Sequence, residues 1–166
     1  MIIAIFSDSH DNMDALEWAL AEAATHGAQH GIHCGDIVAG FMAERMARAP
    51  FDIFAVFGNN DGDHARLQHF ADASKGTLAF SGAMSGTIEL DDQKIFVCHY
   101  PHTAEEAVRT NRYDAVFYGH THAKETHTEG GTVVCNPGEL YGGRTGVTSF
   151  ALYDTTTRAV RFIERT

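Results

Sequence analysis

Short apolar runs bounded by polar residues recur along the chain and indicate buried β-strands. Continuous runs of this length are typical of strands that are covered on both faces. We therefore expect these segments to lie inside the protein. Five of them stand out, at residues 2–6, 31–33, 53–57, 95–98 and 115–118.

Apolar residues at helical spacing lie between and after these runs and predict helices. Met42 and Met46 share one face of the second helical segment, which ends before Pro50. Thr103 and Glu106 have the spacing of a capping box, which predicts the start of the last helix. In all, four helices are expected: the first is capped by Asp11 or Asn12, and the others begin near residues 42, 63 and 103.

The second half of the chain has the pattern of antiparallel strands joined by tight turns. Gly130-Gly131 lies between two strand patterns and predicts a hairpin, and a second hairpin is expected around residues 154–157. Strands that alternate with helices, followed by antiparallel strands, are typical of mixed sheets in an α/β protein. We therefore predict two facing mixed β-sheets flanked by helices, a four-layer sandwich, in a single domain over residues 1–166.

Length and charge limit the possible partners. The 166 residues are 44% hydrophobic and 10% aromatic, which allows a chain of this size to bury a substantial core. The formal net charge of −10 disfavours stable binding of long nucleic acids or of an anionic membrane surface. A small phosphate ester is still a suitable partner if the site itself carries local positive charge.

The cysteines and the first residues bear on the location of the protein. Cys34, Cys98 and Cys135 are far apart and form no CxxC pair, which argues against a disulfide framework and a thiolate zinc site. The first apolar stretch ends at Ser7, so it is too short for a signal peptide or a membrane span. We therefore expect a cytoplasmic protein.

Each of the five apolar runs ends in side chains that can donate electron pairs to a metal ion. If the strands lie side by side, these groups meet at one edge of the sheet, where open α/β sheets place their ligands. Residues two apart in an extended chain point to the same side, so Asp8 with His10, and His120 with His122, can reach one point. The candidate donors are Asp8, His10, Asp36, Asn59, His99, His120 and His122.

The type and number of these donors favour a centre with two ions. Imidazole, carboxylate and amide oxygen suit manganese, iron, nickel or zinc. Seven donors are too many for one ion and fit two ions that share a carboxylate. Taken alone, each motif has an ordinary explanation as a turn, a helix cap or a core histidine. Their joint occurrence, each after an apolar run, makes the metal centre the better interpretation.

The ordered motifs resemble those of the calcineurin-like metallophosphoesterase superfamily, whose pattern is DxH, GDxx, GNH[DE], a further histidine and GHxH. The resemblance extends from residue 2 to about residue 153. It is strongest to the small single-domain phosphodiesterase branch, with Asn136-Pro137-Gly138-Glu139 after the last motif. It implies a pair of mixed sheets flanked by helices, in agreement with the hydrophobic pattern.

The resemblance also implies how the centre works. Asp36 would bridge two divalent ions, and a metal-bound hydroxide would attack phosphorus in line. Mn²⁺ is the expected metal, with iron, nickel and zinc as alternatives. The implied ligands are Asp8, His10 and His122 for one ion, and Asn59, His99 and His120 for the other.

The chain departs from the family pattern at two positions. Asn60 replaces the histidine of GNH[DE]; it can donate a hydrogen bond to a phosphoryl oxygen but cannot deliver a proton, so activated leaving groups are expected. Asn60 and Asp61 of this motif are the predicted catalytic residues. Tyr100 replaces a glycine, and it joins Asn60 and Arg144 as a candidate for substrate binding. Packing beside the site is the alternative for Tyr100, and a surface position is the alternative for Arg144.

Together these features predict a metal-dependent phosphoesterase, in the first place a phosphodiesterase acting on a small phosphate ester. A phosphomonoesterase is the alternative reaction. A non-catalytic interaction scaffold of the same fold, similar to the small subunit of the retromer coat, is the alternative function, although such a module should have lost ligands. The apolar face of Met42 and Met46 is the candidate contact for a homo-oligomer.

Overall fold

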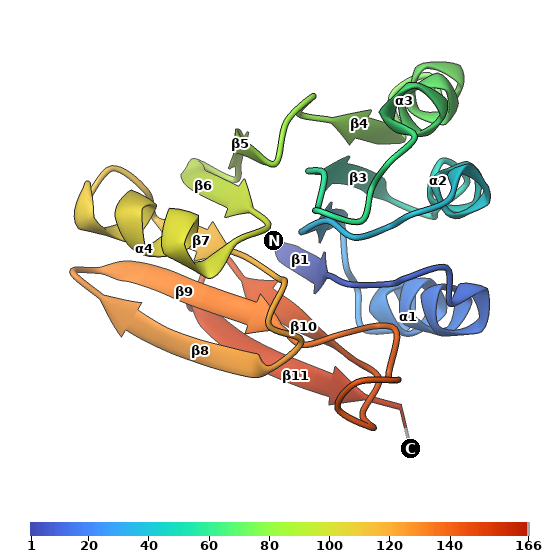
Figure 1. Ribbon diagram of the computed structural model, residues 1–166. Coiled ribbons are helices and arrows are strands. Elements are labelled where there is room, and N and C mark those ends of the chain that lie inside the picture. The colour runs from blue at the N-terminus through green and yellow to red at the C-terminus, as the bar shows by residue number, and fades with distance from the viewer. Residues whose placement is uncertain (166) are drawn as a thin grey trace.

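Two mixed β-sheets face each other, with helices on their outer sides (Figure 1). The structure is a computed structural model that describes residues 1–165. In order across the sheet, the first consists of β11 (Ala159–Glu164), β10 (Ser149–Asp154), β1 (Ile2–Phe6), β2 (His30–His33), β3 (Asp52–Ala55) and β4 (Leu78–Phe80). The second consists of β5 (Ser85–Leu90), β6 (Gln93–Cys98), β7 (Ala115–Phe117), β9 (Thr132–Pro137) and β8 (Lys124–Glu129).

Helices pack on the outer face of each sheet and complete the four predicted layers. Met42 and Met46 are fully buried in this packing, so the prediction that their face forms a homo-oligomer contact is wrong. The first sheet is covered by α1 (Met13–Thr25), α2 (Gly40–Met46) and α3 (His64–Ala73), and the second by α4 (Pro101–Arg109).

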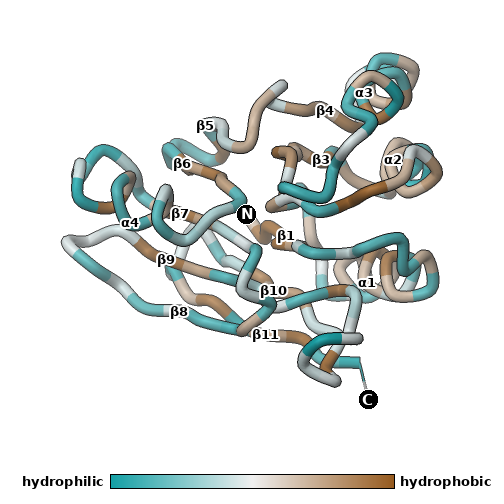
Figure 2. Tube along the Cα trace, viewed as in Figure 1, coloured by the Kyte–Doolittle hydropathy of each residue, from teal (hydrophilic) through white to brown (hydrophobic). Residues whose placement is uncertain are grey.

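The side chains of β1 show why this strand is apolar throughout. Because successive residues of a strand point to opposite faces, Ile3 and Ile5 lie between the sheets, whereas Ala4 and Phe6 lie under the helices. Both faces of β1 are covered, which is typical of a central strand in a sheet that has layers packed on both sides. Figure 2 shows the contrast with β8, which is hydrophilic and exposed along its whole length.

The start of α1 agrees with the sequence prediction, whereas the start of α4 differs from it. Asn12 caps α1, and its Oδ1 accepts a hydrogen bond of 3.1 Å from the backbone N–H of Ala15. α4 begins earlier than predicted, at Pro101, so Thr103 lies inside the helix and does not form a capping box with Glu106. Proline suits a first helical position because the N–H it lacks has no partner there.

The two predicted hairpins are confirmed. β8 pairs antiparallel with β9 across Gly130 and Gly131, whose φ angles are 57° and 89°. Positive φ at both turn residues matches the right-handed twist of the flanking strands. β10 pairs antiparallel with β11 as well. No helix within residues 1–165 has the length and apolar character required to cross a membrane.

The five apolar runs divide between the two sheets. β1, β2 and β3 run parallel in the first sheet, and β6 and β7 run parallel in the second. The strands thus lie side by side only within each sheet, and not all five in one sheet. The polar ends nevertheless converge, because the carboxyl ends of both sets of strands meet in the same region of the molecule.

Candidate metal centre

Two glycines allow the loops at the carboxyl ends of the strands to approach each other closely. A Cβ atom added to Gly119 would lie 2.0 Å from the Oγ of Ser7, and one added to Gly58 would lie 2.1 Å from Oδ1 of Asp36. Any larger residue at these positions would displace Ser7 or Asp36. Each glycine directly precedes a predicted donor in the sequence.

The backbone at five of the predicted donors is in the left-handed region. Such conformations are uncommon for residues other than glycine, and they concentrate at functional sites where the surrounding structure enforces them. The sharp bends turn these side chains toward one another at the ends of the strands. The φ angles are 51° at Asp8, 38° at His10, 57° at Asp36, 67° at His120 and 63° at His122.

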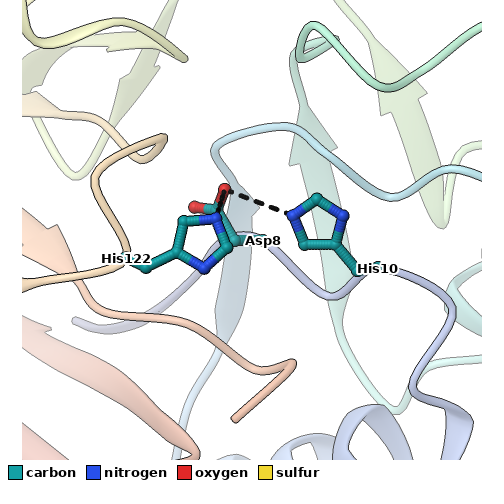
Figure 3. Close-up of side chains that lie close together, drawn as sticks. All are labelled: Asp8, His10 and His122. Carbon is teal, nitrogen blue, oxygen red and sulfur yellow. Dashed lines mark ion pairs between the residues drawn. The ribbon is translucent and has the colours of Figure 1, made fainter. Parts of the chain in front are cut away.

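One group of donors consists of Asp8, His10 and His122 (Figure 3). Oδ1 of Asp8 lies 3.3 Å from Nε2 of His122 and 3.8 Å from Nε2 of His10. The other oxygen of Asp8 accepts hydrogen bonds from the Ser7 hydroxyl at 2.6 Å and from the backbone N–H of His120 at 3.0 Å. One carboxylate oxygen is thus held by the protein, and the other points into the group.

A second group forms around His99. Its Nδ1 lies 2.8 Å from the carbonyl oxygen of Cys34, and donation to that oxygen would leave Nε2 with a free electron pair. Nε2 lies 3.0 Å from Oδ1 of Asn59, which in turn lies 2.9 Å from Nδ1 of His120. Asp8 and Asp36 also lie close enough to His99 to share an ion with it.

Asp36 lies between the two groups. Its Oδ2 is 3.4 Å from Nε2 of His10, and its Oδ1 is 3.5 Å from Nε2 of His99. The structure thus brings all seven predicted donors together. Asp8 lies close enough to His10 and His122, and also to Asp36 and His99, to belong to both groups. The carboxylates of Asp8 and Asp36 therefore both lie between the two groups.

The donor atoms fit a bound cation. Oδ1 of Asp8 and Nε2 of His10 are buried and have no hydrogen-bond partner among the described residues. A buried polar atom without a partner is costly, and a cation bound between these atoms would satisfy both. Carboxylate, imidazole and amide oxygen together are a donor set for a first-row divalent metal.

The charge states of the centre suit metal binding only in part. Burial raises the pKa of Asp8, but contacts with His10 and Ser7 outweigh it and leave the pKa below the usual value. Burial and the neighbouring His99 lower the pKa of His120, which favours the neutral ring that a metal requires. The pKa of His10 is raised by Asp8, so a metal that binds there competes with a proton.

Asn60 and Asp61 have different positions in the centre. The amide nitrogen of the Asn60 side chain donates to Oδ2 of Asp36 at 2.7 Å. The buried carboxylate of Asp61 accepts hydrogen bonds of 2.6–3.0 Å from four backbone N–H groups, and it lies outside the cavity above the donors. It therefore positions the Asp36 loop. These N–H groups belong to Asp36, Ile37, Val38 and Gly58.

Glu139 is a part of the centre to which the sequence analysis assigned no role. Its Oε2 lies 2.6 Å from Nδ1 of His122, and its Oε1 accepts hydrogen bonds from Thr145 Oγ1 at 2.7 Å and from the backbone of Arg144 and Thr145. Burial raises the pKa of Glu139, but the bonds from His122 and Thr145 outweigh it and lower the pKa. In the sequence, Glu139 ends the Asn136-Pro137-Gly138-Glu139 segment that marks the resemblance to the phosphodiesterase branch, but the segment by itself does not show which side chain Glu139 contacts.

A cavity of about 340 Å³ lies above the donors. Arg144 lines it, as the sequence predicts for a substrate-binding residue, and so does Tyr141, which the sequence analysis missed. Tyr100 does not line it. Its ring packs edge-on against His120, with centroids 4.7 Å apart, so the structure supports packing beside the site.

His33, which is fully buried beneath the centre, should make the protein sensitive to acid. Burial lowers its pKa to about 4, whereas the unfolded residue titrates near 6.5. Between these values the unfolded chain binds more protons than the folded protein. Stability is therefore retained above pH 6.5 and lost as the pH falls toward 4, by about 3 kcal/mol in total from this residue.

The prediction for His33 can be checked with metal-free protein. The substitution His33→Asn removes the titration, and asparagine can still accept the hydrogen bond that Nδ1 of His33 receives from Gly35 N–H at 3.2 Å. We expect the difference in unfolding free energy between wild type and variant to change between pH 7 and pH 4. A difference that stays constant over this range would contradict the prediction.

Comparisons with known proteins agree with this architecture. The calcineurin-like phosphoesterase superfamily domain matches residues 1–158. Phosphodiesterase MJ0936 of Methanocaldococcus jannaschii is 32% identical over 165 residues, which are 98% of each chain. A solved archaeal phosphodiesterase superimposes with a TM-score of 0.93 at 30% identity, covering 99% of this chain and 100% of the other. YfcE, a phosphoesterase from E. coli, shares the fold, with a TM-score of 0.69 at 21% identity and 98% of each chain covered.

A two-sheet sandwich with carboxylate, imidazole and amide donors at its strand ends defines the class of binuclear metallophosphoesterases. The match over residues 1–158 and the full-length relative then settle the family. The chain belongs to the calcineurin-like phosphoesterase superfamily.

Proposed function

We propose that the protein is a metal-dependent phosphodiesterase that hydrolyses a small phosphate ester, with residues 1–166 acting as one catalytic domain. The observation that carries this proposal is the convergence of seven donors, in which buried atoms of Asp8 and His10 have no hydrogen-bond partner among residues 1–165. The 32% identity to a full-length relative named as a phosphodiesterase supports the diesterase reaction over a monoesterase.

We assign the donors to two divalent ions, with Mn²⁺ as the first candidate metal. When bound, such ions polarise a phosphoryl oxygen and lower the pKa of water. The orientation of the two Asp36 oxygens, one toward His10 and the other toward His99, supports a bridging role for Asp36. The remaining ligands are Asp8, His10 and His122 for one ion, and Asn59, His99 and His120 for the other.

The other residues of the cavity bind and orient the substrate. Arg144 supplies a positive charge for a phosphate oxygen, and Asn60 can turn its amide from Asp36 to a phosphoryl oxygen. Asparagine delivers no proton to a leaving group, so esters of acidic alcohols should react fastest. Tyr100 positions His120, and Asp61 positions the loop that carries Asp36, so we assign neither of them direct contact with the substrate.

Charge and thiol content are consistent with a small substrate and a reducing location. The net charge of −10 disfavours long nucleic acids as substrates, and the three buried cysteines are free thiols. We therefore infer that the protein works in the cytoplasm on a small ester. An interaction scaffold is disfavoured, because the chain keeps a competent donor at each of the seven positions.

The proposed function can be tested by hydrolysis of bis(p-nitrophenyl) phosphate. Protein stripped with a chelator should be inactive, and addition of Mn²⁺ should restore turnover because the donors bind the ions that activate the phosphate. The same protein should hydrolyse p-nitrophenyl phosphate, a monoester of the same phenol, more slowly. If the folded protein hydrolyses neither ester with Mn²⁺, Fe²⁺, Ni²⁺ or Zn²⁺, the proposal is wrong.

A further inference from the structure

A second groove adjoins the cavity above the donors. It measures about 470 Å³ and is lined by residues of α2 and α3. Asn60 lines both spaces, so a ligand held at the donors can extend past Asn60 into the groove. Its other walls are formed by Val38, Ala39, Gly40, Phe41, Gly62, Asp63 and Arg66.

The loop that forms one wall of this groove is held rigidly. Val38 has a φ of 81°, which is strained for a β-branched residue. Its backbone N–H donates to Oδ1 of Asp61 at 2.6 Å, and the N–H of Ala39 donates to Oδ1 of Asp11 at 2.8 Å. Two carboxylates thus keep a strained loop in place, and such strain is typical of functional sites. The groove is therefore already formed before a ligand binds.

Two side chains in the groove are suited to a planar ring. Phe41 is 46% exposed, although large hydrophobic side chains are mostly buried in this protein. The side-chain stem of Arg66 lies against Gly40, where an added Cβ would come within 2.8 Å of it. The guanidinium of Arg66 already lies over one aromatic ring, with its central carbon 6.0 Å from the centroid of Phe70. An aromatic face and a guanidinium plane both stack on aromatic rings.

We propose that this groove binds an aromatic ester group of a phosphodiester whose phosphate is held by the donors. The proposal rests on the proposed phosphodiesterase function and adds the class of substrate, namely diesters of a phenol or a nucleoside. A diester carries two organic groups, and the site offers two places for them. One is beside Tyr141 and Arg144, and the other is beside Phe41 and Arg66.

The proposal is tested by competitive inhibition of the Mn²⁺-loaded protein by diphenyl phosphate and dimethyl phosphate. Phe41→Ala and Arg66→Ala should each raise the inhibition constant of diphenyl phosphate about three- to tenfold. This is the change in affinity that corresponds to the loss of one stacking contact. The constant for dimethyl phosphate should not change. Phe41→Tyr keeps the ring and should behave as wild type, and Arg112→Ala, at an exposed arginine outside the groove, is the matched control.

The outcomes separate this proposal from the proposed function. If wild type hydrolyses bis(p-nitrophenyl) phosphate but Phe41→Ala leaves the constant for diphenyl phosphate unchanged, the groove proposal is wrong and the proposed function stands. If wild type hydrolyses no diester, the proposed function is wrong, and calorimetric titration with diphenyl phosphate then tests the groove alone. A dimer in sedimentation that Phe41→Ala dissociates, with inhibition unchanged, would assign the groove to a second copy of the chain.

Discussion

Asp36→Asn is expected to lower the turnover of bis(p-nitrophenyl) phosphate about a thousandfold or more. Asp36 has one oxygen near His10 and the other near His99, and both oxygens accept hydrogen bonds from Asn60. Asparagine removes the negative charge and places an NH₂ group where Asn60 donates. Stabilisation of charge by a metal centre is worth several kcal/mol, which corresponds to this loss of rate.

The fold of this variant should survive, because its backbone N–H at position 36 still donates to Asp61. Circular dichroism and thermal unfolding in a chelator check the fold, and calorimetry with Mn²⁺ checks metal binding. Asp72→Asn is the matched control, since Asp72 is exposed on α3 and its side chain accepts a hydrogen bond from Gln68, away from the donors. A folded Asp36→Asn protein with wild-type turnover would show that the site assignment is wrong.

Glu139→Gln is expected to reduce Mn²⁺ affinity or activity about 10- to 100-fold, the usual effect of losing the partner behind a metal ligand. The Glu139 carboxylate holds the His122 ring with one oxygen and the Thr145 turn with the other. A glutamine must turn its NH₂ group toward one of these donors. The His122 ring or the loop that carries Arg144 then loses its support.

Two readouts separate a positioning role of Glu139 from a general loss of stability. Mn²⁺ affinity reports on His122, and the Michaelis constant reports on the loop that carries Arg144. Thr145→Val removes only the hydroxyl that donates to Oε1, so it should raise the Michaelis constant slightly and leave Mn²⁺ affinity unchanged. If Glu139→Gln binds Mn²⁺ as tightly as wild type and has the same kinetics, Glu139 does not position the centre.

Local patterns allowed much of the fold to be predicted from the sequence. The five apolar runs, the Gly130-Gly131 hairpin and the cap at Asn12 each depend on residues that are near one another in the chain. The division of the five runs between two sheets depends on long-range pairing, for which the runs carry no signal. The predicted start of α4, near Thr103, is two residues late. Pro101 and Thr103 both suit a helix start, and the helix begins at Pro101.

The convergence of the donors could be predicted because each one lies within five residues of the end of a buried strand. Asp61 and Tyr100 stand in the same motifs, yet their side chains turn to backbone amides and to a neighbouring ring instead of the cavity. A motif specifies a position in the chain but not the direction of the side chain. Glu139 and Tyr141 lie in a loop, and they reach the centre through contacts that no spacing rule describes.

The centre takes its donors from both sheets, and this has a consequence for synthesis of the chain on the ribosome. Asp8, His10 and Asp36 emerge early, whereas His120 and His122 emerge after two thirds of the chain and Glu139 later still. A nascent chain that ends before these residues has only part of the ligand set and cannot bind metal as the finished protein does. At the proposed centre, loading with metal is therefore expected to be a late event, which marks chains whose two sheets have already come together.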